Sequence, residues 1–183
     1  MPLEAMAERT LDAERIFAVL AEHRVDYVVV GGVAVQAHGH VRMTNDLDLI
    51  PAPNRANLDR LATALRELNA RVLNPGSEDL AIDASMLPRA TLWQLSTEVG
   101  DIDLLHDTPG APPFKELRAR ALTIILGPYE IPVAGRDDLI RMKKAAGRPI
   151  DLEDIAALTE PEHRKIERHR QPGAATDPWP RRH

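Results

Sequence analysis

The stretch Tyr27–Pro51, YVVVGGVAVQAHGHVRMTNDLDLIP, contains the strongest structural signals in this chain. It opens with an apolar run closed by Gly31 and Gly32, which is typical of a strand buried on both faces. A short helix is predicted over 33–38, and a second strand over 46–50 ends at the proline that follows it. The glycine pair therefore marks the point where a buried strand gives way to a helix.

Two aspartates, Asp46 and Asp48, lie on the second strand. Positions two apart on a strand share a face, so both carboxylates point to one side while the leucines point to the other. At an effective dielectric constant of about 20, two carboxylates a few ångströms apart repel each other by roughly 3 to 4 kcal/mol. Mg²⁺ prefers carboxylate oxygens and offsets this repulsion. The pattern therefore predicts a magnesium site.

The length and composition predict one soluble domain. The chain has 183 residues, of which 44% are hydrophobic and 28% charged, which suits a single core with a small helical appendage. It has no apolar run long enough to span a membrane, and the N-terminus lacks the apolar core of a secretory signal. The absence of cysteine excludes disulfides, thiolate zinc sites and a cysteine nucleophile. A cytoplasmic protein without a membrane partner is expected.

The charge and the aromatic content limit the ways in which this chain can bind nucleic acid. The net charge is −5, whereas a dedicated duplex-binding surface usually carries a basic excess. Aromatic residues make up 3% of the chain, which leaves few platforms for stacking single-stranded bases. Any contact with RNA is therefore expected to be local.

Four further strands are predicted in the second half of the core. Residues 91–97 and 100–105 read as a hairpin, and the second of these strands carries Asp101 and Asp103. Residues 122–126 and 129–134 read as two more strands. The polar, proline-containing segment 74–89 has no regular pattern and is predicted to be a loop.

The pattern becomes helical after Gly135, and Asp151 is predicted to cap the second of these helices. We therefore expect a core over 1–135 and a helical C-terminal segment over 136–170 that packs on it. The last segment, 171–183, contains three prolines and is predicted to be disordered.

Three motifs occur in an order that resembles the nucleotidyltransferase superfamily that includes DNA polymerase β: VVVGG at 28–32, DLD at 46–48 and IDL at 102–104. Over roughly 12–160, the chain also resembles small bacterial nucleotidyltransferases related to the toxins of abortive-infection and toxin–antitoxin systems. That likeness rests on RMTNDLD, GDIDLL and DDLIRMKKAAGRPIDLEDIAAL. The resemblance implies an α/β nucleotidyltransferase fold, a short mixed twisted sheet flanked by helices, with a helical C-terminal segment.

The resemblance also implies roles for the aspartates. In nucleotidyl transfer a hydroxyl attacks the α-phosphorus of a nucleoside triphosphate, and two metal ions about 4 Å apart stabilise the attacking and leaving oxygens. Asp46 and Asp48 would hold Mg²⁺. Asp103, as the third carboxylate, would bind the metal next to the acceptor hydroxyl and help to remove its proton. Asp101, two residues earlier on the same face, is the alternative.

Four residues near the DLD strand are predicted to bind the triphosphate. Gly31 and Gly32 permit a close backbone approach to phosphate, and the helix after them offers free N–H groups. Arg42 would supply a charge-assisted contact and Thr44 a hydroxyl to the same phosphates. A simple ion pair with Asp46 is the other interpretation of Arg42.

Lys143 matches a lysine of the related small enzymes, which implies that it neutralises charge on the pyrophosphate, with Lys144 as its rival. A solvated helix face is an equally good interpretation of both. Arg148, Asp151 and Asp154 also match the related pattern. The usual lysine before the first of these aspartates is replaced by isoleucine, which weakens any acceptor role for this segment.

The resemblance implies Mg²⁺-dependent transfer of a nucleoside monophosphate from an NTP to an acceptor hydroxyl. A tRNA end or a protein acceptor, with a cognate antitoxin as a further partner, would fit the toxin-like relatives. An aminoglycoside or lincosamide would fit antibiotic-modifying ones. A non-catalytic module that binds a nucleotide or a partner is the alternative from another class.

Overall fold

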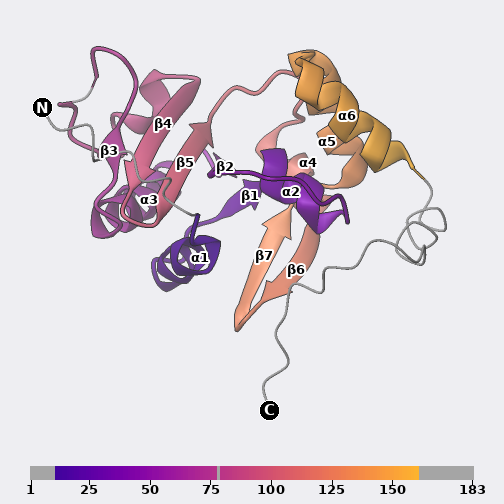
Figure 1. Cartoon of the computed structure of the whole chain (residues 1–183). Helices are drawn as coiled ribbons and strands as arrows, with labels where there is room; N and C mark the ends of the chain where they lie inside the picture. Colours follow the sequence, from indigo (N-terminus) through magenta and orange to yellow (C-terminus); the bar gives the residue numbers. More distant parts are fainter. Residues whose placement is uncertain (1–10, 78, 161–183) are drawn as a thin grey trace, which may run out of the picture.

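The structure, a computed structural model, describes residues 11–77 and 79–160 (Figure 1). The segment predicted to be disordered, 171–183, and the last part of the predicted helical segment, 161–170, lie outside these residues. No helix among the described residues is long and apolar enough to cross a membrane.

The described residues form one mixed seven-stranded sheet with strand order β3-β4-β5-β2-β1-β7-β6. The strands are β1 (Tyr27–Val29), β2 (Asp46–Pro51), β3 (Arg71–Val72), β4 (Leu92–Thr97), β5 (Gly100–Leu105), β6 (Leu122–Leu126) and β7 (Tyr129–Val133). β2 runs parallel to β5 and β1 runs parallel to β7, whereas every other neighbouring pair is antiparallel. The predicted mixed sheet is confirmed.

Six α-helices are described: α1 (Ala13–Glu22), α2 (Gly31–Ala37), α3 (Arg55–Glu67), α4 (Phe114–Ala119), α5 (Arg136–Ala146) and α6 (Pro149–Thr159), with a short 3₁₀ turn over Leu87–Arg89. The helix α1 packs against α3 and β7, and α4 packs against β1. The helices α5 and α6 pack on each other, and α5 also contacts α2 (Figure 1). The helix α5 therefore lies against the helix that follows β1, and α6 packs on α5.

The central strands alternate as their sequences predict. Leu47 and Leu49 of β2 are at most 1% exposed, and Ile102 and Leu104 of β5 are fully buried. The aspartates between them are half-buried and lie on the opposite face. β1 is buried along its whole length, because strands on both of its edges and α4 cover it. One face of β2 and β5 thus belongs to the core and the other is free for polar chemistry.

The helix boundaries differ from the sequence predictions at two functional positions. The helix α2 begins at Gly31 rather than at residue 33, so the glycine pair forms its first turn. The helix α6 begins at Pro149, so Asp151 is its third residue rather than its N-cap. Arg148 is the N-cap, and its backbone N–H donates to Asp151 Oδ2 at 3.0 Å. Proline fixes the first helical residue and thereby moves the start upstream.

Candidate active site

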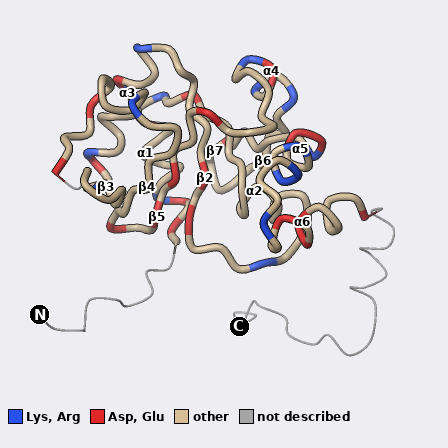
Figure 2. The backbone as a smooth tube through the Cα atoms, turned by 90° about the horizontal axis from the view of Figure 1, so that it is seen from above, with Lys and Arg blue, Asp and Glu red and all other residues tan. Residues whose placement is uncertain are grey.

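The carboxylates of β2 and β5 form two adjacent rows. In the parallel register of these strands Asp46 lies opposite Asp101 and Asp48 lies opposite Asp103. All four side chains are half-buried. Figure 2 shows the acidic segments of β2 and β5 side by side in the middle of the molecule. The structure therefore brings the three predicted catalytic aspartates onto one face, with Asp101 at the end of the same row.

The electrostatics of this face show mutual repulsion. Burial, followed by the charges of Asp48 and Asp46, raises the pKa of Asp103 to about 7. Burial and the charge of Asp46 also raise the pKa of Asp48, although the Gly32 backbone N–H and two cations oppose this. Repulsion between charged carboxylates favours either protonation of one of them or the binding of a cation. Asp103 is the direct neighbour of Asp48, whereas Asp101 is the neighbour of Asp46.

The rows form an open face rather than a closed metal cage. Within residues 11–77 and 79–160, no three His, Cys, Asp or Glu side chains are already gathered closely enough to hold a metal ion. An all-oxygen donor set of this kind suits Mg²⁺, which usually takes one or two carboxylates and completes its shell with water and substrate phosphates. Assignment of the metal to Asp46, Asp48 and Asp103 therefore stays a prediction.

The glycine pair permits a close approach between α2 and the acidic face. Gly31 has φ +62°, and a Cβ placed there would lie 2.8 Å from the Asp48 Cβ and closer still to its carboxylate. A Cβ on Gly32 would lie 2.7 Å from Thr44 Oγ1 and 2.8 Å from Arg42 Nη2. Real Cβ atoms do not come within 3.0 Å of another Cβ, and the backbone at Gly31 is left-handed, so only glycine fits there, whereas a Cβ at Gly32 would displace the ends of the Thr44 and Arg42 side chains.

Replacing Gly31 with alanine is expected to destabilise the protein and to displace the Asp48 carboxylate. The left-handed conformation alone costs about 1–2 kcal/mol for a residue with a Cβ. Gly76→Ala is the matched control, because Gly76 has φ +76° and no atom within 4 Å of the added carbon. Urea unfolding should show a clearly larger loss for Gly31→Ala. Equal losses in the two variants would mean that Asp48 does not depend on this glycine.

Thr44 and Arg42 are both engaged by aspartates. Thr44 Oγ1 donates to Asp46 Oδ1 at 2.9 Å, so this hydroxyl orients the first carboxylate of the DLD motif. Arg42 Nη1 donates to Asp154 Oδ2 at 2.8 Å. The arginine therefore pairs with a carboxylate of α6 and not with Asp46, the neighbour that the sequence suggested.

An ionic cluster of five residues joins α5 and α6 to the loop before β2: Arg42, Lys143, Arg148, Asp151 and Asp154. Lys143 Nζ lies 3.1 Å from Asp151 Oδ1 and 2.6 Å from Asp154 Oδ2. These three side chains are at most 6% exposed. Figure 2 shows charges of both signs where α6 meets this loop. Lys144, the rival of Lys143, is exposed.

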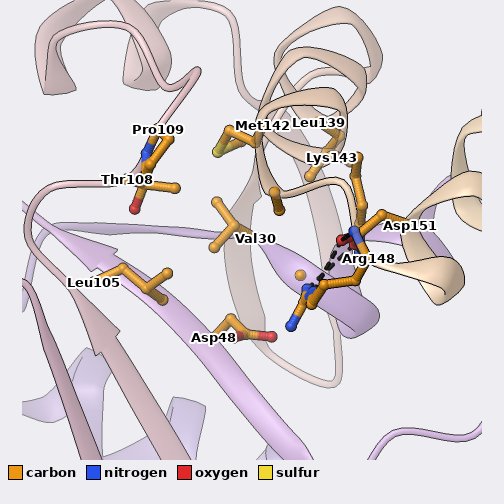
Figure 3. A pocket seen from close by; sticks show the side chains of 12 residues that line it. Val30, Asp48, Leu105, Thr108, Pro109, Leu139, Met142, Lys143, Arg148 and Asp151 are labelled. Atoms are coloured by element: carbon orange, nitrogen blue, oxygen red, sulfur yellow. Dashed lines mark hydrogen bonds and ion pairs between the residues drawn. The ribbon is translucent and has the colours of Figure 1, made fainter.

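Arg148 is the most accessible member of the ionic cluster. Its Nε donates to Asp151 Oδ2 at 2.8 Å, and its side chain is 66% exposed. Burial would raise the pKa of Asp151, but hydrogen bonds from Arg148 and Lys143 lower it to about 2. The carboxylate is thus charged at neutral pH and fixes one edge of the guanidinium. The other edge extends toward Asp48 (Figure 3).

A cavity of about 270 Å³ lies between these groups. Asp48 lies on one side, and Lys143 and Arg148 lie on another (Figure 3). Gly31 also lines the cavity. The remaining wall is largely aliphatic and includes Leu105, Pro109, Leu139, Met142 and Ala146. A ligand that has both anionic and apolar parts matches this lining, because the cations can meet its charge and the aliphatic wall its apolar part.

The predicted site residues thus come together, and three further residues join them. Arg148, Asp151 and Asp154 matched a family pattern in the sequence but were not predicted to bind substrate. One local signal could have identified the two aspartates: a spacing of three residues on a helix places both on one face. The contact of Asp154 with Arg42 spans 112 residues of sequence and has no local signal.

Comparisons with known proteins show the fold. The chain was compared with family models and with curated protein sequences, and neither comparison gives a match. Among solved structures, the lincosamide antibiotic adenylyltransferase LnuA in its lincomycin-bound form is similar with a TM-score of 0.58 and 15% identity, covering 83% of this chain and 98% of LnuA. The antibiotic-resistance factor ANT(2'')-Ia in complex with adenylyl-2''-tobramycin is similar with a TM-score of 0.53 and 15% identity, over 85% of this chain and 91% of that one.

A third similar structure is an antigenic nucleotidyltransferase-like protein from Paracoccidioides brasiliensis, with a TM-score of 0.52 and 18% identity, covering 81% of this chain and 77% of that one. The chain therefore has the nucleotidyltransferase fold that its motifs predict. The structural neighbours do not bear on the resemblance to toxins of toxin–antitoxin systems.

Proposed function

We propose that this protein is a nucleotidyltransferase that moves a nucleoside monophosphate from an NTP to an acceptor hydroxyl with the help of Mg²⁺. The observation that carries the proposal is the placement of Asp48 beside Asp103 on parallel strands, with Asp48 and Arg148 both lining one cavity. Carboxylates on one side and cations on the other suit a metal-bound triphosphate.

Asp46, Asp48 and Asp103 would hold the magnesium. Their fit is supported by an all-carboxylate donor set and by the raised pKa of Asp103, whose causes after burial are the charges of the other two. When bound, Mg²⁺ stabilises negative charge on the attacking and leaving oxygens of an in-line displacement. Thr44 keeps Asp46 oriented through its hydroxyl.

The other site residues would bind the substrates and move a proton. Gly31 and Gly32 let the triphosphate approach the backbone, and Lys143 and Arg148 neutralise the charge that develops on the pyrophosphate. The Asp103 carboxylate, whose pKa in the metal-free protein is raised to about 7, would accept the proton of the acceptor hydroxyl. The aliphatic wall of the cavity would pack against the apolar part of a substrate.

Two classes of acceptor are equally well supported. LnuA and ANT(2'')-Ia are antibiotic-modifying proteins, and their structural similarity favours an antibiotic hydroxyl. The sequence resemblance to toxins favours a tRNA end or a protein side chain, with a cognate antitoxin as a partner. A cytoplasmic location suits both. A non-catalytic nucleotide-binding module remains the alternative. The presence of all three carboxylates favours an enzyme over such a module.

A screen with α-labelled nucleotides tests the proposal and separates these acceptors. The protein is incubated with each labelled NTP and Mg²⁺, together with total RNA, with cell extract, or with an aminoglycoside and a lincosamide. We expect label on one acceptor class and stoichiometric release of pyrophosphate. Heat-treated protein is the control. Absence of transfer and of pyrophosphate with every donor and acceptor would favour the non-catalytic module.

A further inference from the structure

The side chain of Arg42 connects α6 to the glycine turn. Its Nη1 donates to Asp154 Oδ2 at 2.8 Å, while a Cβ built on Gly32 would lie 2.8 Å from its Nη2. The guanidinium therefore lies between the buried carboxylate of Asp154 and the first turn of α2. The arginine side chain is 20% exposed, whereas that of Asp154 is 1% exposed. The exposed part of the guanidinium can thus meet a ligand while Asp154 holds the rest.

Asp154 divides its charge between two cations. Oδ2 accepts from Arg42 Nη1 and also lies 2.6 Å from Lys143 Nζ. In the described part of the chain, Asp154 Oδ1 and Arg42 Nε are buried without a hydrogen-bond partner. A buried donor and a buried acceptor without hydrogen-bond partners lower the stability of the folded protein, so folding alone would not favour this ion pair. Such an arrangement is expected where an ion pair serves a site rather than stability.

An arginine side chain that is not held has many rotamers, and fixing it on binding would weaken affinity. Asp154 removes this freedom before a ligand arrives. The bond also sets the direction of the planar guanidinium, whose fork of donors matches phosphate oxygens. The carboxylate of Asp154 on α6 therefore holds the guanidinium of Arg42, and this guanidinium in turn lies next to the glycine turn of Gly31 and Gly32.

We propose that Asp154 is a positioning residue that holds Arg42 over Gly32, so that the free N–H groups of Arg42 bind the phosphates of the NTP. This inference rests on the proposed function and extends it to a residue that does not itself touch substrate. The ligand class is a metal-bound triphosphate. The competing interpretation is a purely structural one, in which Asp154 only fastens α6 to the core.

Inorganic tripolyphosphate with Mg²⁺ is the probe, because it carries the phosphates without a base. Calorimetry is used to compare its dissociation constant for wild type, Asp154→Asn, Arg42→Gln and the double variant. We expect each single variant to bind about tenfold more weakly, as loss of one charge-assisted contact implies. The double variant should be no weaker than either single one, because both changes remove the same contact.

Asp138→Asn is the matched control. Asp138 is 1% exposed and lies on α5, and it pairs with Arg120 and Arg141 rather than with a cation of the ionic cluster. This variant should lower the melting temperature while its tripolyphosphate affinity stays within about twofold of wild type. If Asp154→Asn fails to fold, Arg42→Gln still tests the phosphate contact, since Arg42 is partly exposed.

Two results would overturn the inference: unchanged tripolyphosphate affinity in Asp154→Asn or Arg42→Gln, or losses that multiply in the double variant. Failure of the inference is distinguishable from failure of the proposed function. If wild type transfers label but Asp154→Asn binds tripolyphosphate normally, only the positioning role is wrong. If wild type binds neither tripolyphosphate nor any NTP with Mg²⁺, both are wrong.

Discussion

Replacing Asp48 with asparagine is expected to abolish nucleotidyl transfer and the thermal stabilisation of the protein by Mg²⁺ and NTP. Asp48 lies beside Asp103 in the sheet register and lines the cavity opposite Arg148. Loss of its charge removes one of the three carboxylates that we propose as metal ligands. The transfer rate should fall by more than about a hundredfold, as for other losses of preorganised charge stabilisation.

The thermal effect follows from preferential binding to the folded state. A ligand at a hundred times its dissociation constant stabilises a protein by about 2.7 kcal/mol. For a domain of 150–250 residues this corresponds to a rise in melting temperature of about 5–10 °C. Wild type should show this rise with Mg²⁺ and the correct NTP, and Asp48→Asn should not.

Asp59→Asn is the control for this experiment. Asp59 is an exposed carboxylate on α3 that pairs only with Arg55 among the described residues, so its loss changes the net charge without touching the site. It should keep the ligand-induced rise. If Asp48→Asn and wild type respond equally to Mg²⁺ and NTP, the metal does not bind where we place it.

Replacing Asp103 with asparagine is expected to stabilise the metal-free protein at pH 8 while it removes transfer activity. In the folded protein, burial and the charges of Asp48 and Asp46 raise the pKa of Asp103 from 3.8 to about 7. Between these two values the folded state binds more protons than the unfolded state, so stability falls as the pH rises. The protonated form contributes its full stability below about pH 4 and loses it through pH 7.

Urea unfolding in EDTA at pH 5, 6, 7 and 8 measures this dependence. The free energy of unfolding of wild type should decline across the series, and the decline should be smaller in Asp103→Asn. Saturating Mg²⁺ should remove the difference in the free energy of unfolding between wild type and Asp103→Asn at pH 8, because the metal takes the place of the proton on the Asp103 carboxylate. Parallel curves for wild type and Asp103→Asn without metal would contradict the repulsion on which the site is built.

Asp101→Asn separates the two candidates for the third carboxylate. Asp101 lies on the same face of β5 as Asp103. In the strand register it is the neighbour of Asp46, whereas Asp103 is the neighbour of Asp48. If Asp103 is the third ligand, Asp101→Asn should retain transfer activity and keep the pH dependence of wild type. The reverse outcome, activity lost in Asp101→Asn and kept in Asp103→Asn, would reassign the role to Asp101.

The features of this site that depend on residues close together in sequence could be predicted. Alternation along a strand has a period of two, so the common face of Asp46 and Asp48 and the burial of Leu47 and Leu49 could be predicted from spacing alone. The hairpin of β4 and β5 was likewise marked by its turn. These features depend on neighbours within a few residues.

The long-range contacts have no local signal in the sequence, and only the family resemblance grouped Asp103 with Asp46 and Asp48. The register that puts Asp48 beside Asp103 joins strands far apart in sequence, and a slip of one residue would have turned Asp103 to the other face. The pairing of Arg42 with Asp154 depends on the packing of α6 against the loop before β2. The strand β3 has two residues, too few for a periodic signal.

A crystal of the protein with Mn²⁺ and a non-hydrolysable NTP analogue would locate the metal, because Mn²⁺ can replace Mg²⁺ at an oxygen site and is identified by its anomalous scattering. We expect an anomalous peak in contact with Asp48 and Asp103, with the triphosphate between that peak and Arg148. A nucleotide bound elsewhere, or a peak that touches neither aspartate, would contradict it.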